Sequence, residues 1–248
     1  MNNRAPSAIF GTVSNLLNDN NLVRGAWGVV VAAALSCGGA RTQPQEPAPL
    51  PTAALPTGGL AGQRVSLFPL TLVAAEDSLR WESYLAHRAT TLTSADSIIT
   101  ALLLGRVPEI PWVTPDELRH AARRAAGLAT DPSQMGTAIL RADQLVDVPD
   151  PLRSQLRTLI ALAGGGGGRY VLIPAALVYR RPRIPDPRGA HGSASRAAAP
   201  GTGTAELSVV LVDVRIGKVQ WRTVARGDGG DPWAALTAAV KALTPGLP

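Results

Sequence analysis

The run of residues 170–179, YVLIPAALVY, constrains the fold of this chain most, because it is apolar nearly throughout. Such a run is typical of a central β-strand that is buried on both faces of a sheet. The other predicted elements follow the order β-α-α-β-α-α-β-β-β-α along the chain. Together they indicate an α/β (α+β) domain, in which helices flank a mixed sheet of about five strands.

Further strands are expected on either side of this run. Residues 65–73 are mostly apolar, and Pro69 among them suits a strand end or a sheet edge because it donates no ladder hydrogen bond. Residues 207–214 and 219–225 predict a hairpin, and Gly217 supplies the positive φ that its turn needs.

The clearest helix start lies at Thr114. With Thr114 as the N-cap, Pro115 takes the first helical position and Glu117 completes a Thr-x-x-Glu capping box. The same pairing of a cap with a proline recurs at residues 150–151 and 231–232, which predicts two more helices. The arginines of the helix after Thr114 are expected to point to solvent rather than to form an anion site: Arg119, Arg123 and Arg124.

Two helices are also predicted between the first strand and Thr114. The first covers residues 78–90, and the second is capped by Ser94 and ends at Gly105, where a glycine commonly follows a helix.

The N-terminal region indicates export. Residues 25–36 form an uncharged run that ends at Cys37, the only cysteine of the chain. A bilayer-spanning helix needs about 20 apolar residues, so this run is too short for a stable anchor. With Arg24 as its cationic flank, it suits the hydrophobic region of a signal peptide. We therefore predict a signal peptide over residues 1–36, with Val23 as an alternative start of translation.

Residues 34–38, ALSCG, resemble a bacterial lipobox, in which a small residue precedes a lipidated cysteine. The resemblance implies lipidation of Cys37, and cleavage after Ala40 by an ordinary signal peptidase is the alternative. In either case the domain is exported and faces the periplasm or the cell surface. Gly38 after the cysteine favours the outer membrane in a Gram-negative host.

Composition divides the rest of the chain. Residues 37–62 are small, polar and proline-rich, without apolar periodicity, which predicts a disordered tether. Residues 63–248 are expected to form a single domain. Within it, residues 181–204 are rich in Pro, Gly, Ser and Ala and predict a flexible loop.

The net charge of +6 does not indicate nucleic-acid binding. Of the 24 basic residues only Lys218 and Lys241 are lysines, and the arginines are spread along the chain. A nucleic-acid-binding surface gathers its cations on one face, often between stacking aromatic side chains, and aromatics are only 4% of this sequence. No nucleic-acid partner is expected.

The sequence assigns no catalytic, cofactor-binding or metal-ligating residue. His87, His120 and His191 lie on separate predicted elements, without metal-ligand spacing. Asp213 is expected to support a turn, and Asp231 to cap the last helix. The chain is therefore predicted not to be an enzyme and to need no small-molecule cofactor, while a hydrolase built from two distant carboxylates stays open.

Three segments resemble a recurrent pattern of envelope lipoproteins: RVSLFPL at residues 64–70, RYVLIPAALVY at 169–179 and LSVVLVDVRIGKVQW at 207–221. In that pattern an apolar strand ends in Asp, a turn with Gly follows, and the next strand carries Trp. Over residues 63–243 the chain is similar to curli-secretion lipoproteins, penicillin-binding-protein activator lipoproteins and the amino-terminal domain of TolB. The resemblance implies a small mixed sheet flanked by helices that works by protein–protein contact, and it carries over no catalytic residue.

The leading hypothesis is therefore an exported, lipid-anchored envelope protein that binds an envelope protein partner without catalysis. Trp112, Trp221 and Trp233 are candidates for an interaction surface, although core packing is the expected role of each, and pairing along a sheet edge is a second mode. Two alternatives stay open. One is a periplasmic enzyme that acts on cell-wall polymer, and the other is a module that binds an anionic envelope polymer through exposed arginines.

Overall fold

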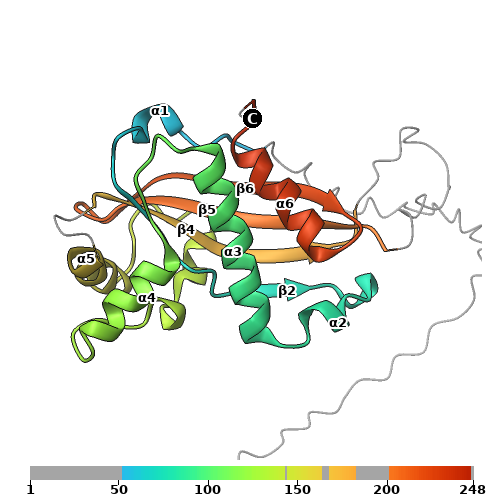
Figure 1. Ribbon diagram of the computed structural model, residues 1–248, viewed down its shortest axis with the longest axis horizontal. Helices are drawn as coiled ribbons and strands as arrows, with labels where there is room; N and C mark the ends of the chain where they lie inside the picture. Colours follow the sequence, from blue (N-terminus) through green and yellow to red (C-terminus); the bar gives the residue numbers. More distant parts are fainter. Residues whose placement is uncertain (1–51, 143, 164–167, 183–200, 247–248) are drawn as a thin grey trace, which may run out of the picture. The chain divides into compact units, whose positions relative to one another are not determined.

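The computed structural model describes residues 52–142, 144–163, 168–182 and 201–246 (Figure 1). The predicted signal peptide, Cys37, His191 and most of the predicted loop at 181–204 lie outside the described residues. Among the residues that are described, no helix has the length and the hydropathy needed to cross a bilayer.

A six-stranded sheet forms the centre of the domain (Figure 1). Its strands are β1 (Val65–Leu67), β2 (Val73–Ala75), β3 (Trp112–Val113), β4 (Tyr170–Arg180), β5 (Gly203–Asp213) and β6 (Lys218–Gly229). The order is β3-β1-β4-β5-β6, and β2 also pairs with β4. Because β4 runs parallel to β1 and β2 and antiparallel to β5, the predicted mixed sheet around a central strand is confirmed.

Six α-helices accompany the sheet in the described part of the chain. They are α1 (Thr57–Leu60), α2 (Glu82–Leu85), α3 (Arg88–Arg106), α4 (Pro115–Arg124), α5 (Leu152–Ala163) and α6 (Pro232–Leu243). Short 3-10 turns lie at η1 (Asp77–Leu79), η2 (Pro132–Gln134) and η3 (Thr137–Arg141). The prediction of a sheet flanked by helices is thus confirmed.

Alternate side chains of β4 enter two separate hydrophobic cores. Leu172, Leu177 and Tyr179 belong to the core under α3 and α6, and Figure 1 shows both helices crossing the same face of the sheet. Val171 and Ile173 belong to the core under α4 and α5. Full burial of an aliphatic side chain stabilises the fold by about 1.5–3 kcal/mol. β4 therefore joins both layers, as does β5, with Leu207 in one core and Val210 in the other.

The predicted strand at residues 65–73 is two strands, β1 and β2, because the chain leaves the ladder at Pro69. Pro69 has no N–H to donate. The N–H of Leu70 donates instead to the carboxylate of Asp96 in α3, at 2.7 Å. The chain rejoins β4 at Val73, further along the same edge, so β1 and β2 lie one after the other beside β4.

The two helices predicted between residues 78 and 105 are divided differently in the structure. A short α2 is followed by α3, which already begins at Arg88, so Ser94 lies inside a helix and caps nothing. Gly105 also lies inside α3 and does not end it. The helix continues to Arg106, whose Nε donates to Thr244 Oγ1 at 2.7 Å and so fastens the end of α3 to the end of α6.

The predicted starts of α4 and α6 are confirmed. Thr114 Oγ1 accepts from Glu117 N, and Glu117 Oε2 accepts from Thr114 N at 2.7 Å, which completes the capping box. Asp231 Oδ1 accepts from the N–H groups of Trp233 and Ala234 at 2.9 Å each. The third predicted pair, at residues 150–151, directly precedes α5, which begins at Leu152.

The prediction that Arg119 points to solvent is wrong. Its guanidinium pairs with the buried carboxylate of Asp96 in α3 and with Asp116 at 2.9 Å, which ties α3 to α4. Burial raises the pKa of Asp96, even though the bonds from Leu70 N and Arg119 favour its charged form. Because Asp96 comes from a distant element, the helix pattern around Arg119 holds no sign of this pairing. The other two arginines of α4 are exposed, as predicted.

Residues 52–62, which the sequence assigns to the tether, are packed against the domain. Leu55 and Leu60 are only 4% and 2% exposed, and both belong to the core under α3 and α6. The N–H of Leu55 also donates to Leu243 O at 2.8 Å. The proline-rich composition of the segment predicts a tether, and it gives no sign that these two leucines are buried.

The predicted hairpin is confirmed and is longer than the sequence indicates. β5 begins at Gly203, so the last residues of the predicted loop are strand residues. Gly217 has a φ of +72° in the turn, as the prediction requires. Trp112, Trp221 and Trp233 are partly buried and pack against the core under α3 and α6, which is the core role expected of them.

Gly227 of β6 lies directly under α6, where a Cβ atom would overlap the backbone of Ala238 and Ala239. We predict that Gly227→Ala lowers the free energy of unfolding by about 1–3 kcal/mol, because the helix must move off the sheet. Gly230→Ala is the matched control, since a Cβ atom there meets open space, and its effect should stay within about 0.5 kcal/mol. Urea denaturation measures both, and equal effects would contradict this packing.

Candidate functional site

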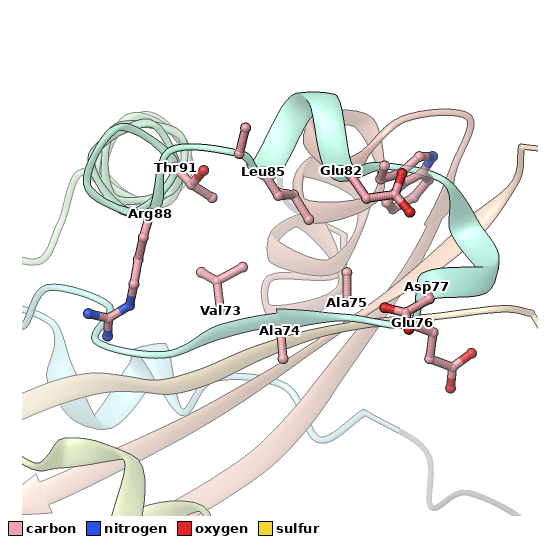
Figure 2. A pocket seen from close by; sticks show the side chains of 11 residues that line it. Val73, Ala74, Ala75, Glu76, Asp77, Glu82, Leu85, Arg88 and Thr91 are labelled. Atoms are coloured by element: carbon pink, nitrogen blue, oxygen red, sulfur yellow. The ribbon is translucent and has the colours of Figure 1, made fainter.

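A hollow of about 350 Å³ lies beside β2, between that strand and the elements that follow it, α2 and the start of α3 (Figure 2). Figure 2 shows Val73 and Ala75 pointing into the hollow and Leu85 of α2 facing them, while Ala74 points to the other side of the strand. Trp81 lines the hollow as well. Its interior is therefore mainly apolar.

The hollow lies at a sheet edge to which no strand of the described chain is added. β3 pairs with β1 through Trp112 and Val113, outside β1. The chain then leaves the sheet, because Thr114 caps α4. No strand of the described chain therefore continues from β3 along the outer edge of β2. In that part of the chain β2 pairs with one strand, β4.

The backbone groups on the open edge of β2 belong to Val73 and Ala75. The hydrogen bonds to β4 come from the intervening positions, since Leu72 O accepts from Leu177 N at 2.9 Å and Glu76 N donates to Tyr179 O at 3.0 Å. In a ladder, backbone groups of successive residues point alternately to the two edges of the strand. The N–H and C=O groups of Val73 and Ala75 therefore point away from β4, where a further strand would bind them.

A rigid aromatic pair supports the inner wall of the hollow. The ring of Trp81 is 4% exposed and packs edge-on against Tyr179, with the ring centroids 5.3 Å apart. Trp81 also lies over Gly203, where a Cβ atom would overlap its ring. The Tyr179 hydroxyl is buried without a hydrogen-bond partner among the described residues, and burial raises its pKa above the usual range. This wall is fixed by packing and does not depend on a polar network.

The rim of the hollow is charged differently at its two ends (Figure 2). Asp77 and Glu82 are exposed near the Ala75 end, and neither side chain has a hydrogen bond or ion pair within the described part of the chain. At the Val73 end Arg88 donates from Nη2 to Thr71 O at 2.7 Å. The hollow thus combines apolar walls with carboxylates at one end and a guanidinium at the other.

Glu76, the third carboxylate of the lining, already has partners. Its Oε2 accepts from Arg181 N at 3.1 Å, and its other oxygen lies 4.0 Å from the Arg180 guanidinium. Figure 2 shows its side chain pointing away from the hollow. Arg180 in turn pairs with Glu206 at 3.0 Å on the sheet face away from α6. Of the three carboxylates that line the hollow, only those of Asp77 and Glu82 are therefore free to bind a cation.

The opposite edge of the sheet, along β6, is covered by other segments of the chain. Val219 N donates to Val146 O at 2.8 Å, and Val148 N donates to Gly217 O at 2.8 Å. Further along, Thr52 Oγ1 donates to Val224 O at 3.3 Å. Exposed edges invite pairing with other chains, and this fold covers much of the β6 edge while it leaves β2 open.

The residues that the sequence singled out for chemistry lie on separate elements, and none of them is among the residues that line the hollow, although His87 stands between Ala86 and Arg88, which do. His87 directly precedes α3, and His120 is exposed on α4. Asp213 is buried at the end of β5, where it accepts from Arg169 Nε at 2.7 Å and from Arg215 N at 3.0 Å, so it supports the turn as predicted. In the described ranges no three His, Cys, Asp or Glu side chains gather as a metal site.

Sequence reasoning missed the hollow itself. One signal was present, because Pro69 interrupts an apolar run and indicates an edge position. The placement of β2 beside the far half of β4, and of Leu85 across from it, depends on how α2 and α3 pack. Neither is encoded in a local pattern.

Comparisons with known proteins find distant similarity to solved structures only. No protein-family model and no curated protein matches the sequence. The LpoB C-terminal domain from Salmonella enterica is similar, at 13% identity over 67% of this chain and 82% of that chain, with a TM-score of 0.34. The PelC dodecamer from Paraburkholderia phytofirmans is similar at 14% identity over 79% of this chain and 92% of that chain, with a TM-score of 0.33. The lipoprotein GNA1162 from Neisseria meningitidis is similar at 15% identity over 66% of this chain and 78% of that chain, with a TM-score of 0.29. All three TM-scores lie below 0.5, so the similarity of this chain to these structures is distant.

Proposed function

We propose that this chain is an exported, lipid-anchored envelope protein that binds another envelope protein without catalysis, and that the hollow beside β2 is where it binds. The observation that carries the proposal is the open edge of β2 with an apolar hollow next to it. Backbone groups at a sheet edge, together with a pocket for side chains, are the two elements that recognition of an extended peptide uses.

The anchor rests on the sequence around Cys37. We propose that the signal peptide is removed before Cys37 and that this cysteine carries the lipid, which places the domain on the outer membrane in a Gram-negative host. The segment between Cys37 and Leu55, the first buried residue in the described part of the chain, then connects the lipid to the domain. Fully extended chain spans at most about 3.5 Å per residue, so the domain reaches partners well away from the bilayer surface.

The arrangement of the arginines favours a protein partner over an anionic polymer. Several arginines are engaged in ion pairs or hydrogen bonds with other groups of the fold. Arg119 pairs with Asp96, Arg180 pairs with Glu206, and Arg181 donates to Ser78 O at 3.1 Å. A salt-dependent polymer-binding surface would need such side chains free on one face.

The anchor predicts the mass of the mature protein. We expect the intact mass of protein recovered from membranes to show a diacyl or triacyl adduct on a chain that begins at Cys37. Cys37→Ser should lose the adduct and the membrane attachment, because serine offers no thiol to the lipid. An unmodified chain that still carries residues 25–36 would contradict export and anchoring together.

Binding at the hollow predicts position-dependent cross-linking in the intact envelope. A photo-reactive phenylalanine in place of Leu85 should yield one discrete protein adduct, because Leu85 faces the hollow. The control places the same group at Ile216, which is 48% exposed in the β5–β6 turn, and should give no such adduct. Equal adducts from both positions, or none from Leu85, would contradict the proposed function.

A further inference from the structure

The edge of β2 carries an inference that rests on the proposed function and names the chemistry of the partner. We propose that the partner binds as an extended strand added to β2, with an apolar side chain in the hollow and a lysine or arginine beside Asp77 and Glu82. The domain then supplies the sheet edge, and the partner supplies a strand of alternating apolar and polar residues.

The backbone sets the register of such a strand. Val73 and Ala75 each present one N–H and one C=O on the open edge, since the groups that bond to β4 belong to Leu72, Glu76 and the position between Val73 and Ala75. A strand added there lies beside β2 in the position that β3 takes beside β1. Successive side chains of a strand point to opposite faces, so every second side chain of the partner points toward the hollow.

The hollow selects an apolar side chain. Its lining by Val73, Ala75, Leu85 and Trp81 offers hydrocarbon surface, and Trp81 is held in place by Tyr179 and by the lack of a side chain at Gly203. A charged side chain in the same place would lose its hydration against these walls. A β-branched residue such as valine fits a strand conformation as well.

The rim selects the charge of the flanking residue. Asp77 and Glu82 have no ion-pair partner among the described residues, whereas Arg88 at the other end is bonded to Thr71 O. A lysine or arginine of the partner strand that lies near Ala75 forms ion pairs with both carboxylates. The chain as a whole is basic, at +6, so this acidic rim stands out as a local preference for a cationic segment.

A defined peptide tests the proposal against the full-length protein. The probe is a capped peptide of about six residues that alternates valine and threonine and carries a lysine at each end. We expect it to shift the amide NMR signals of Val73, Ala75 and Leu85. Backbone N-methylation at alternate positions should weaken binding by about tenfold when it removes the N–H groups that face β2, and much less when it removes those that face away.

Charge supplies the matched control. Asp77→Asn with Glu82→Gln should weaken the lysine peptide by about fivefold at low salt, and should leave the same peptide with threonine ends unchanged. The proposal is overturned if peptides with glutamate ends bind as well as those with lysine ends, or if N-methylation has no effect of position. It is also overturned if the edge of β2 instead pairs with a second copy of this chain, which light scattering would show as a dimer that the peptide does not dissociate.

The two proposals fail in different ways. If the peptides do not bind but cross-linking from Leu85 still yields a discrete adduct, the protein-binding function stands and strand addition falls. If the peptides bind as expected but no adduct forms in the envelope, the edge has the inferred chemistry and the proposed function falls.

Discussion

The burial of β4 on both faces is the constraint from which the rest of the domain follows. A strand whose side chains alternate between two apolar cores must have helices on each side, here α3 and α6 over one face and α4 and α5 over the other. Glycines of β6 allow α6 to approach the sheet closely, and the pair of Asp96 with Arg119 joins α3 to α4. The site lies where this arrangement is incomplete, at the edge beside the far half of β4.

That incompleteness has a local cause in the chain. Pro69 takes the backbone out of the ladder between β1 and β2, and the capping box at Thr114 turns the chain away after β3 has covered only β1. Both devices are strong local signals, and together they leave β2 without an outer neighbour in the described chain. By contrast, residues 52–53 and 145–148 lie along β6 and shield it. The fold therefore protects one edge and exposes the other.

Local patterns in the sequence predict the central strand, the hairpin with Gly217 and the starts of α4 and α6, because each depends on residues close together in the chain. Pro69 signals a strand end, but local patterns do not predict that the chain rejoins β4 at Val73 or that Arg119 pairs with Asp96, because both depend on α3 packing against distant segments. The proline-rich composition around Leu55 and Leu60 gives no sign of their burial, because that burial also depends on packing against distant segments. The hollow combines residues of β2, α2 and α3, so no single motif encodes it.

The account depends most directly on the outer edge of β2 being unpaired in the protein itself. Amide hydrogen exchange of the full-length chain, followed by NMR, measures this at single residues. We expect the amides of Val73 and Ala75 to exchange rapidly, while those of Glu76 and Leu177, which bond across to β4 and β2, are protected. Protection of Val73 and Ala75 equal to that of Glu76 would mean that the edge is already occupied, and would contradict the account.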